Sequence, residues 1–254
     1  MKERLERFVR DLGVDDVGVA SVSAYESPQS PPLPSIFPEV RSLVVLAYKE
    51  LSTCESPSPQ IAMAGRLDVM EFARSCNYKT ARFLERETGG KAMTVPPSYP
   101  MEMTRRTKGA VADVSLRHAA VAAGLGVFGR HNLVIHPQLG TRVVFTAVMT
   151  DADLPADPPM QASLCTACNR CVENCPGGAL DEEGRTHLMK CLKHSQPYGL
   201  AANIGFWSGF AEATPPERKE MLRADEYWRL YQSAFMGFQY FCFTCLKSCP
   251  VGQG

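Results

Sequence analysis

The sequence has no excess of charge of either sign and no long apolar run. Its 254 residues include 27 lysines plus arginines and 27 aspartates plus glutamates, so neither a net positive field nor a basic block attracts nucleic acid. No apolar run is long enough to cross a bilayer. The first residues, MKERLERFVRDLG, lack the apolar core of a secretory signal and a twin-arginine motif. These absences argue against nucleic-acid and membrane partners and predict a cytoplasmic protein.

Cysteine, by contrast, is abundant and patterned. Of ten cysteines, four form the run CTACNRCVENCP at residues 165–176. In bacterial ferredoxins, C-x2-C-x2-C-x3-C-P gives three thiolates to one 4Fe-4S cluster and the fourth to another. A second run at residues 242–250 has the spacing C-x2-C-x3-C-P, and Cys191 lies between the two runs. Two clusters need eight thiolates, so the count closes without Cys54 or Cys76.

Exchange of the fourth ligand divides these eight thiolates into two sets. The first cysteine set is expected to contain Cys165, Cys168, Cys171 and Cys249. The second cysteine set is expected to contain Cys175, Cys191, Cys242 and Cys245. Zinc and disulfide bonds are the alternatives. Zinc sites usually combine C-x2-C pairs or cysteine with histidine, and a reducing cytoplasm keeps thiols free, so both alternatives are less favoured than iron–sulfur clusters.

Hydrophobic periodicity predicts helices and strands in alternation before the cysteine runs, which favours an α/β sheet domain. Helices are expected at residues 3–12 and 116–123. A third is expected between the proline-containing CESPSP and Gly89, with an apolar stripe that runs from Val69 to Leu84. The expected strands cover residues 17–20, 42–48, 91–95, 132–136 and 142–150. The linker-like DADLPADPPMQAS follows, so we expect one domain at residues 1–155 and a cluster domain at residues 156–254.

The cluster domain is too long for a plain ferredoxin. About fifty residues separate Cys191 from Cys242, and unstructured loops of this length are uncommon. Pro215 and Pro216 open a helical pattern with an apolar face. That face consists of Met221, Ala224, Trp228, Tyr231 and Phe235. The sequence therefore predicts a structured helical insertion at about residues 195–240.

The stretch AGLGVFGRHNLVIHPQLG, residues 123–140, contains four glycines and two histidines. Gly124, Gly126 and Gly129 match the spacing of a dinucleotide fingerprint, but they follow an expected helix and precede an expected strand, the reverse of what that fingerprint requires. This order argues against NAD. His131 and His136 lie five residues apart in a strand-like run and would point to opposite faces, so structural roles are favoured for both.

Taken in this order, the glycine stretch and the cysteine runs resemble the cobalamin-dependent iron–sulfur reductases, the group that contains epoxyqueuosine reductases and reductive dehalogenases. The resemblance implies a nitroreductase-like, cobalamin-binding α/β (α+β) domain followed by a ferredoxin-like domain with two 4Fe-4S clusters. Electrons would pass singly through the clusters to the cobalt of base-off cobalamin. It also implies that the corrin ring and its tail are lined by Gly124, Leu125, Gly126, His131, Asn132 and Gly140. The alternative is that the glycines only permit a tight helix-to-strand turn.

The resemblance leaves the proton donor open. Epoxyqueuosine reductases place an aspartate upstream of the glycine stretch, and Asp113 is the nearest counterpart here, although it is closer to that stretch than in the family. In reductive dehalogenases the proton donor is a tyrosine with a basic helper. By this resemblance, the counterparts here are Tyr99, Arg105 and Arg106. The family's transfer-RNA-gripping extension does not follow the last cysteine run, which also speaks against a nucleic-acid substrate.

The leading hypothesis is a cytoplasmic cobalamin-dependent reductase of a small organic substrate, supplied with electrons by a ferredoxin or flavodoxin. The second is a corrinoid-binding electron-transfer or carrier protein that reduces or delivers cobalamin to a partner without substrate chemistry. A third is a plain two-cluster ferredoxin fused to an unrelated α/β domain.

Overall fold

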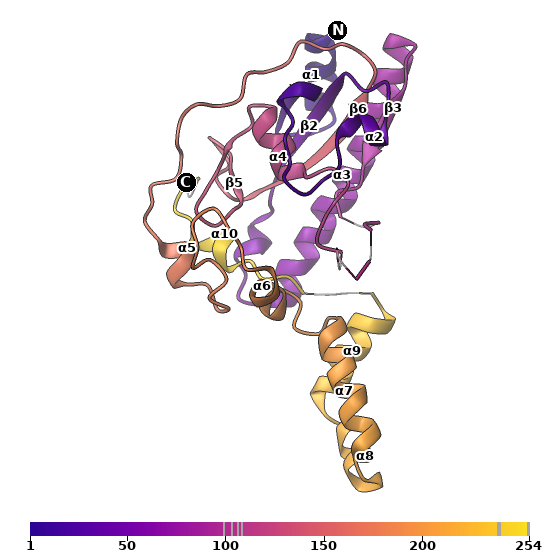
Figure 1. The fold of residues 1–254 in the computed structure, drawn as a ribbon, viewed down its shortest axis with the longest axis vertical. Helices are drawn as coiled ribbons and strands as arrows, with labels where there is room; N and C mark the ends of the chain where they lie inside the picture. Colours follow the sequence, from indigo (N-terminus) through magenta and orange to yellow (C-terminus); the bar gives the residue numbers. More distant parts are fainter. Residues whose placement is uncertain (99, 103, 106, 108, 238–239, 253–254) are drawn as a thin grey trace.

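The computed structural model describes the whole chain except residues 99, 103, 106, 108, 238–239 and 253–254. A four-stranded sheet forms the centre of its larger part (Figure 1). The strands are β1 (Asp16–Ser21), β2 (Ser42–Lys49), β3 (Ala92–Val95) and β6 (Val143–Thr150). Their order is β1-β2-β6-β3. All four strands were predicted from the sequence, and β2 and β6 are buried along nearly their whole length.

Neighbouring strands of this sheet are antiparallel throughout. An α/β sheet built from alternating elements is usually parallel. Because β2 and β3 both pair antiparallel with β6, they run in the same direction, and the helix between them makes the expected crossover. The last strand, β6, then enters between them in the opposite direction. The domain is therefore α+β.

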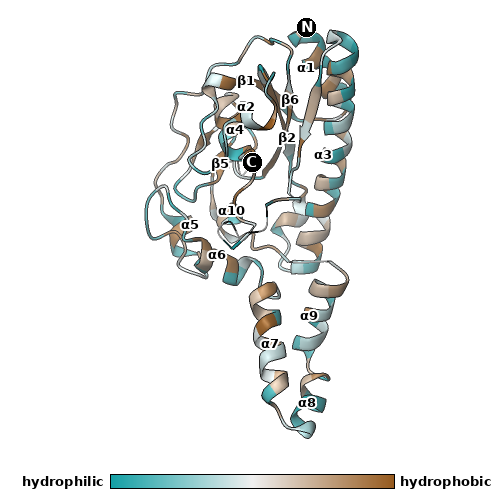
Figure 2. Ribbon diagram, turned by 45° about the vertical axis from the view of Figure 1, so that its right-hand side comes forward, coloured by the Kyte–Doolittle hydropathy of each residue, from teal (hydrophilic) through white to brown (hydrophobic). Residues whose placement is uncertain are grey.

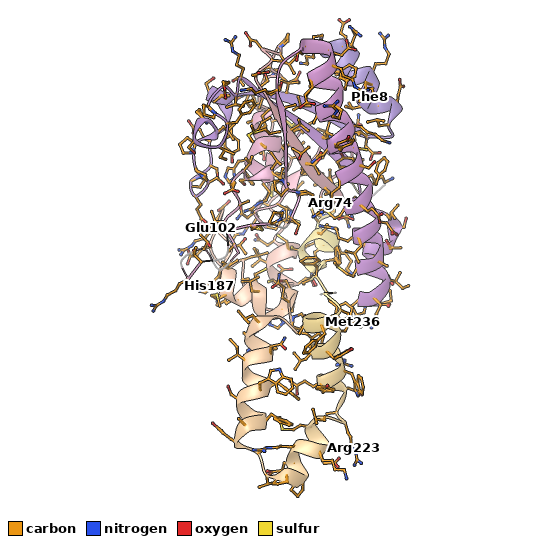
Figure 3. All side chains as sticks on the ribbon, turned by 90° about the vertical axis from the view of Figure 1, so that its right-hand side faces the viewer. Phe8, Arg74, Glu102, His187, Arg223 and Met236 are labelled. Carbon is orange, nitrogen blue, oxygen red and sulfur yellow. The ribbon has the colours of Figure 1, made fainter. Side chains whose placement is uncertain are left out.

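Two helices cover one face of the sheet and a third covers the other (Figure 2). The first face packs on α1 (Lys2–Asp11) and the long α3 (Pro59–Thr88), whose contact includes the Phe8 and Phe83 rings at 4.3 Å. Figure 3 labels Phe8 at this end of the molecule. The opposite face packs on α4 (Leu116–Ala122) and the segment after β1. Burial of apolar area on both faces is the main source of stability.

The cysteine runs lie at one end of this domain, beside a small hairpin of β4 (Val127–Phe128) and β5 (Val134–Ile135). The strand predicted at residues 132–136 is shorter because Asn132 has a positive φ of 60°. The short helices of the cluster region are α5 (Arg170–Glu173), α6 (Leu188–Ser195) and α10 (Thr244–Ser248). Remaining short elements are η1 (Val22–Ala24), α2 (Leu33–Ile36) and η2 (Ser52–Glu55).

The predicted insertion is a helical hairpin that projects away from the rest of the molecule (Figure 1). We call it the arm; it contains α7 (Leu200–Glu212), α8 (Pro215–Met221) and α9 (Asp225–Phe235). The single helix predicted from Pro215 onward is wrong, because the chain turns between α8 and α9, where Ala224 is extended with ψ of 148°. Asp225 and Glu226 in the first turn favour a new helix start there.

No helix in the part of the chain that the structure describes is both long and apolar enough to span a bilayer.

Candidate functional site

Four cysteines from both runs line one small cavity. They are Cys165, Cys168, Cys171 and Cys249, which is the first cysteine set. Cys171 and Cys249 are buried, whereas Cys168 is exposed. Burial raises the pKa of the Cys171 thiol, and the nearby Cys165 and Cys168 raise it further. The chain therefore brings a cysteine from its last residues beside three that lie about eighty residues earlier.

Backbone geometry explains how the first run wraps this cavity. Ala167 and Asn169 both have positive φ, 52° and 58°, so the chain turns sharply between successive cysteines. Asn169 then precedes α5, and the Cys168 thiol meets the amide of Arg170 at the start of that helix. This backbone amide is the main cause of a lowered pKa at Cys168. A thiolate, which iron requires, is favoured at such a position.

The second cysteine set gathers residues from three separate segments. Cys191 lies in α6 and Cys245 in α10. Burial raises the pKa of Cys245 to about 12, and the neighbouring thiols of Cys242, Cys191 and Cys175 add to that effect. Burial likewise raises the pKa of Cys191, with Cys242 and Cys175 again close by.

Buried thiols that repel one another as thiolates ionise only when a positive centre joins them. Cys171 in the first set and Cys191 and Cys245 in the second fit that requirement, so the donor set suits iron–sulfur clusters. Among the described residues, no three histidine, cysteine, aspartate or glutamate side chains converge as ligands of a single ion. The thiols of the first cysteine set instead surround a space. Cys54 and Cys76 lie elsewhere, packed in separate apolar clusters.

A buried arginine fixes the last cysteine run to the sheet domain. The Arg142 guanidinium donates to the carbonyl oxygens of Cys249 at 2.7 Å and Lys247 at 2.8 Å, and to the Glu55 carboxylate at 2.9 Å. Beside it, the Thr141 hydroxyl donates to the Leu246 carbonyl at 2.8 Å. These bonds satisfy carbonyls at the C-terminal end of α10, where helical partners are missing.

Two large cavities lie between the sheet domain and the second cysteine set. The first cavity, about 720 Å³, is lined by residues 27–30, 96–98, 101, 110–112, 114–118, 132 and 184–189. The second cavity, about 840 Å³, is lined mainly by one side of α3, the start of β6 and Phe241. Both include Pro97, Ser98, Leu116 and Arg117, so they adjoin. Figure 3 labels Arg74 of the second cavity and His187 of the first.

The cavities also border the second cysteine set along the chain. Leu188 and Met189, in the first cavity, precede Cys191 in α6. Phe241, in the second cavity, directly precedes Cys242. A molecule that filled these cavities would therefore lie next to the second cysteine set.

Two polar residues at the start of α4 face the first cavity and were not singled out from the sequence. The Arg117 guanidinium donates to the Asn132 carbonyl at 2.6 Å. His118 Nδ1 lies 2.8 Å from the Ser115 hydroxyl, and its ring tilts against Phe128 at 4.9 Å. Burial, followed by the charge of Arg117, lowers the pKa of His118. Their adjacency in SLRH, directly after an irregular loop, was the only available signal.

The predicted corrin-lining residues are placed unevenly. Asn132 lines the first cavity. Leu125 is in the core beneath the sheet. Gly124, with φ of 72°, approaches the Pro158 carbonyl, and Gly126 lies against the Ile135 carbonyl so closely that a Cβ would collide with it. Gly140 has the same constraint against the Val251 carbonyl. For these three glycines the geometry supports the tight-turn alternative.

Neither histidine of the stretch is part of the lining of the two large cavities. His131 is 4% exposed, and its Nδ1 accepts the Leu133 amide at 3.0 Å. Burial lowers the pKa of His131 to about 4, and its Nε2 has no hydrogen-bond partner among the described residues. His136 Nδ1 accepts the amides of Gln138 and Leu139, so its Nε2 donates to Asp16 at 3.1 Å. His136 is thus a fully bonded structural residue.

Of the predicted proton donors, Asp113 lies near the first cavity without lining it. Asp113 is exposed and lies on the loop whose residues 110–112 and 114–116 line the first cavity, but its own side chain is not part of that lining. Tyr99 and Arg106 fall outside the described residues. Arg105 is described, and it lines neither large cavity.

Comparisons with known proteins give one matching family model and several relatives. Residues 159–181 match the family model described as a 4Fe-4S binding domain. An epoxyqueuosine reductase from Bacillus subtilis is 22% identical over an alignment that spans this whole chain and 64% of that protein. The chain spans less than two thirds of the length of this and other curated epoxyqueuosine reductases that it matches.

Solved structures share the fold. An epoxyqueuosine reductase crystallised with an epoxyqueuosine-modified tRNA-Tyr stem loop has a TM-score of 0.63 at 16% identity, covering all of this chain and 65% of that one. A reductive dehalogenase, whose structure suggests a mechanism for B12-dependent dehalogenation, has a TM-score of 0.59 at 19% identity, covering 75% of this chain and 28% of that one.

The first of these structures corrects one expectation. A protein of this fold holds a transfer-RNA stem loop, so the argument against a nucleic-acid partner does not stand. That argument used the summed charge of the chain, and a sum does not describe the local surface that meets a ligand. The predicted resemblance to the epoxyqueuosine reductase and reductive dehalogenase group of iron–sulfur reductases is confirmed by sequence relatives and by fold.

Proposed function

We propose that this chain is a cobalamin-dependent iron–sulfur reductase that carries two 4Fe-4S clusters. The observation that carries the proposal is the pair of adjoining cavities, whose lining includes Met189, two residues before Cys191, and Phe241, directly before Cys242. Ligand pockets usually measure about 300–1,000 Å³. Each cavity alone suits a drug-sized molecule, and the two together suit a larger, flat one such as a corrin with its side chains.

The positions of the cysteine sets support an electron path through the chain. The first set includes an exposed thiol, Cys168, which is where an electron donor such as a ferredoxin or flavodoxin would meet the chain. The second set contains no exposed thiol, and residues near Cys191 and Cys242 in the chain border the cavities. Electrons would enter at the first cluster and leave from the second. Burial and hydrogen bonds to sulfur, such as the Ala179 amide to Cys175 at 3.3 Å, tune such clusters.

Cobalamin, when bound, would supply a redox-active cobalt ion. Arg117 and Asn132 would hold polar groups of the ligand where the two cavities meet, because both line the first cavity and are already bonded to each other. His131 and His136 do not reach either cavity, which supports binding in the base-off form without a ligand from those two residues. Asp113 and Tyr99 remain the proposed proton donors, since a general acid must reach the substrate.

Titration of the purified, cluster-loaded protein with cobalamin under anaerobic conditions tests this proposal. We expect a shift of the visible spectrum to the base-off form at one equivalent per chain. Arg117→Ala should weaken binding at least tenfold, whereas Arg82→Ala, which removes an exposed arginine paired with Glu85 on α3, should not. Absence of binding in the wild type would leave a two-cluster ferredoxin with an unrelated domain.

A corrinoid carrier without substrate chemistry is the second candidate, because the Asp113 side chain stands outside the cavity lining. The third candidate is a reductase whose substrate is a nucleic acid, because one similar structure contains a transfer-RNA stem loop. Single-turnover reactions of the reduced, cobalamin-loaded protein with a halogenated aromatic compound and with an epoxyqueuosine-containing stem loop separate the three. Turnover of either compound identifies a reductase and its substrate class, and turnover of neither supports a carrier.

A further inference from the structure

The arm exposes an unusual amount of apolar surface for an isolated helical hairpin. Six of its large side chains are between 40% and 73% exposed. They are Leu200, Ile204 and Trp207 on α7 and Trp228, Tyr231 and Phe235 on α9. Surface patches of this kind mark interaction sites when the residues are contiguous.

Helix geometry places all six on one face of the arm. Phe206 and Leu230 are buried and define the sides on which α7 and α9 face each other, and the Phe206 and Tyr227 rings lie 6.0 Å apart. With about 100° per residue, each exposed stripe lies between about a quarter and a half turn from that buried side, in the same rotational sense along its helix. Because α7 and α9 run in opposite directions, equal rotations bring both stripes to the same side of the hairpin.

We propose that this apolar face binds the same face of a second copy of the chain, so that two arms form a four-helix bundle. Side chains of this size present roughly 150–250 Å² each when free, so the six offer on the order of 700 Å² per copy. A standard protein interface buries about 800 Å² per partner. The face therefore has nearly the area of a stable dimer interface, and its aromatic content is typical of one.

Charge on the arm favours a second copy over other occupants. Residues 212–229 contain five acidic and four basic side chains. A strongly acidic or basic protein would find no complementary field there, and a lipid-binding helix usually carries lysine and arginine along its polar face. Two identical, nearly neutral arms do not repel each other, and their mixed charges can pair across a twofold axis.

The arm also connects directly to the second cysteine set. Cys191 lies in α6, nine residues before the first residue of α7. Cys242 lies seven residues after the last residue of α9. Dimerisation would therefore hold the two chain segments that carry Cys191 and Cys242 in fixed relation. This proposal does not depend on cobalamin binding, and its test uses neither cobalamin nor turnover.

Sedimentation velocity of the full, cluster-loaded chain over a dilution series tests the proposal. The wild type should sediment as twice the 27.9 kDa chain, and Trp228→Glu and Trp207→Glu should each raise the dimer dissociation constant at least 100-fold. The control Tyr78→Glu changes an aromatic residue that is 65% exposed on α3 and should leave the dimer intact. Equal iron content would show that all variants fold.

Tryptophan emission gives a second readout, because both tryptophans of the chain lie on this face. When dilution dissociates the wild-type dimer, the emission should shift to longer wavelength because the two indole rings become exposed to solvent. A wild-type monomer at on the order of 100 µM, the weak end of specific association, would overturn the proposal. So would a dimer that survives both glutamate substitutions, or a monomer whose tryptophans bind lipid vesicles.

Discussion

Arg142 links the sheet domain to the C-terminal cysteine run through charged hydrogen bonds. Its guanidinium is almost wholly buried and contacts the carbonyls of Lys247 and Cys249, the latter a proposed cluster ligand. A hydrogen bond from a charged donor contributes about 1.5–3 kcal/mol, and its loss leaves buried carbonyls unsatisfied. The main role of Arg142 is therefore to position the backbone of Lys247 and Cys249.

Replacement of Arg142 should therefore loosen the first cluster. We expect Arg142→Met to lower iron toward half of the wild-type content and to remove the electron paramagnetic resonance signal of the first cluster, while the second cluster's signal persists. The exposed Arg41→Met is the matched control. Full iron with unchanged signals of both clusters would show that Arg142 does not position Cys249.

The ligand assignment itself makes a residue-scale prediction. Cys249→Ser should lower iron from about eight to about four atoms per chain, because the first cluster loses one of its four thiolates. Cys54→Ser should leave iron unchanged, since Cys54 packs in an apolar cluster with Ala62. Unchanged iron in Cys249→Ser would contradict the exchange of ligands between the two runs.

His131 should make the fold sensitive to acid. Its pKa in the folded chain is about 4 because of burial, whereas an unfolded histidine has a pKa near 6.5. Between these values the unfolded chain takes up a proton that the folded chain does not, so stability is lost as pH falls through this window, by at most about 3 kcal/mol.

The apparent unfolding midpoint, measured from pH 7 to pH 4 on cluster-loaded protein, checks this. His131→Asn keeps an acceptor for the Leu133 amide but cannot titrate, so its midpoint should fall less steeply than that of the wild type. Identical slopes for the two proteins would remove His131 as a cause of acid instability.

At the scale of elements, periodicity and turn residues predicted most of the sheet domain. The N-cap of α3 is Ser58, whose side chain accepts the Ile61 amide, and its C-cap is Gly89, with φ of 69°; both caps are readable in the sequence. The antiparallel direction of β6 and the turn between α8 and α9 were not readable. Each depends on contacts between distant segments, which local patterns do not record.

Gly140 is an element-scale test of how the two parts of the chain meet. Its φ is 58°, and a Cβ would collide with the Val251 carbonyl just beyond the last cysteine run. Gly140→Ala should lower the free energy of unfolding by about 1–3 kcal/mol through strain and displacement of that run. Gly205→Ala, in α7 with open space around it, should stabilise its helix by up to about 1 kcal/mol. Thermal unfolding of both variants measures the contrast.

At the scale of the whole molecule, the sequence contains a signal for the cysteine sets, which stay a prediction, but none for the cavities. Cluster ligands follow fixed spacings because the cluster imposes them. The cavity walls come from segments around residues 28, 70, 97, 115 and 186, which share no pattern and meet only after folding. Of the residues predicted to line the corrin, Asn132 alone lines a large cavity in the part of the chain that the structure describes.

In the proposed arrangement, electrons enter at the first cysteine set, which includes the exposed Cys168, and pass to the second set, which adjoins the two cavities. The measurement that tests it most directly is the electron paramagnetic resonance of cobalt in cobalamin-loaded protein with the clusters reduced. We predict a cobalt signal broadened by the nearby second cluster, which sharpens in Cys245→Ser. A sharp cobalt signal in the wild type, unchanged when the clusters are reduced, would contradict the account.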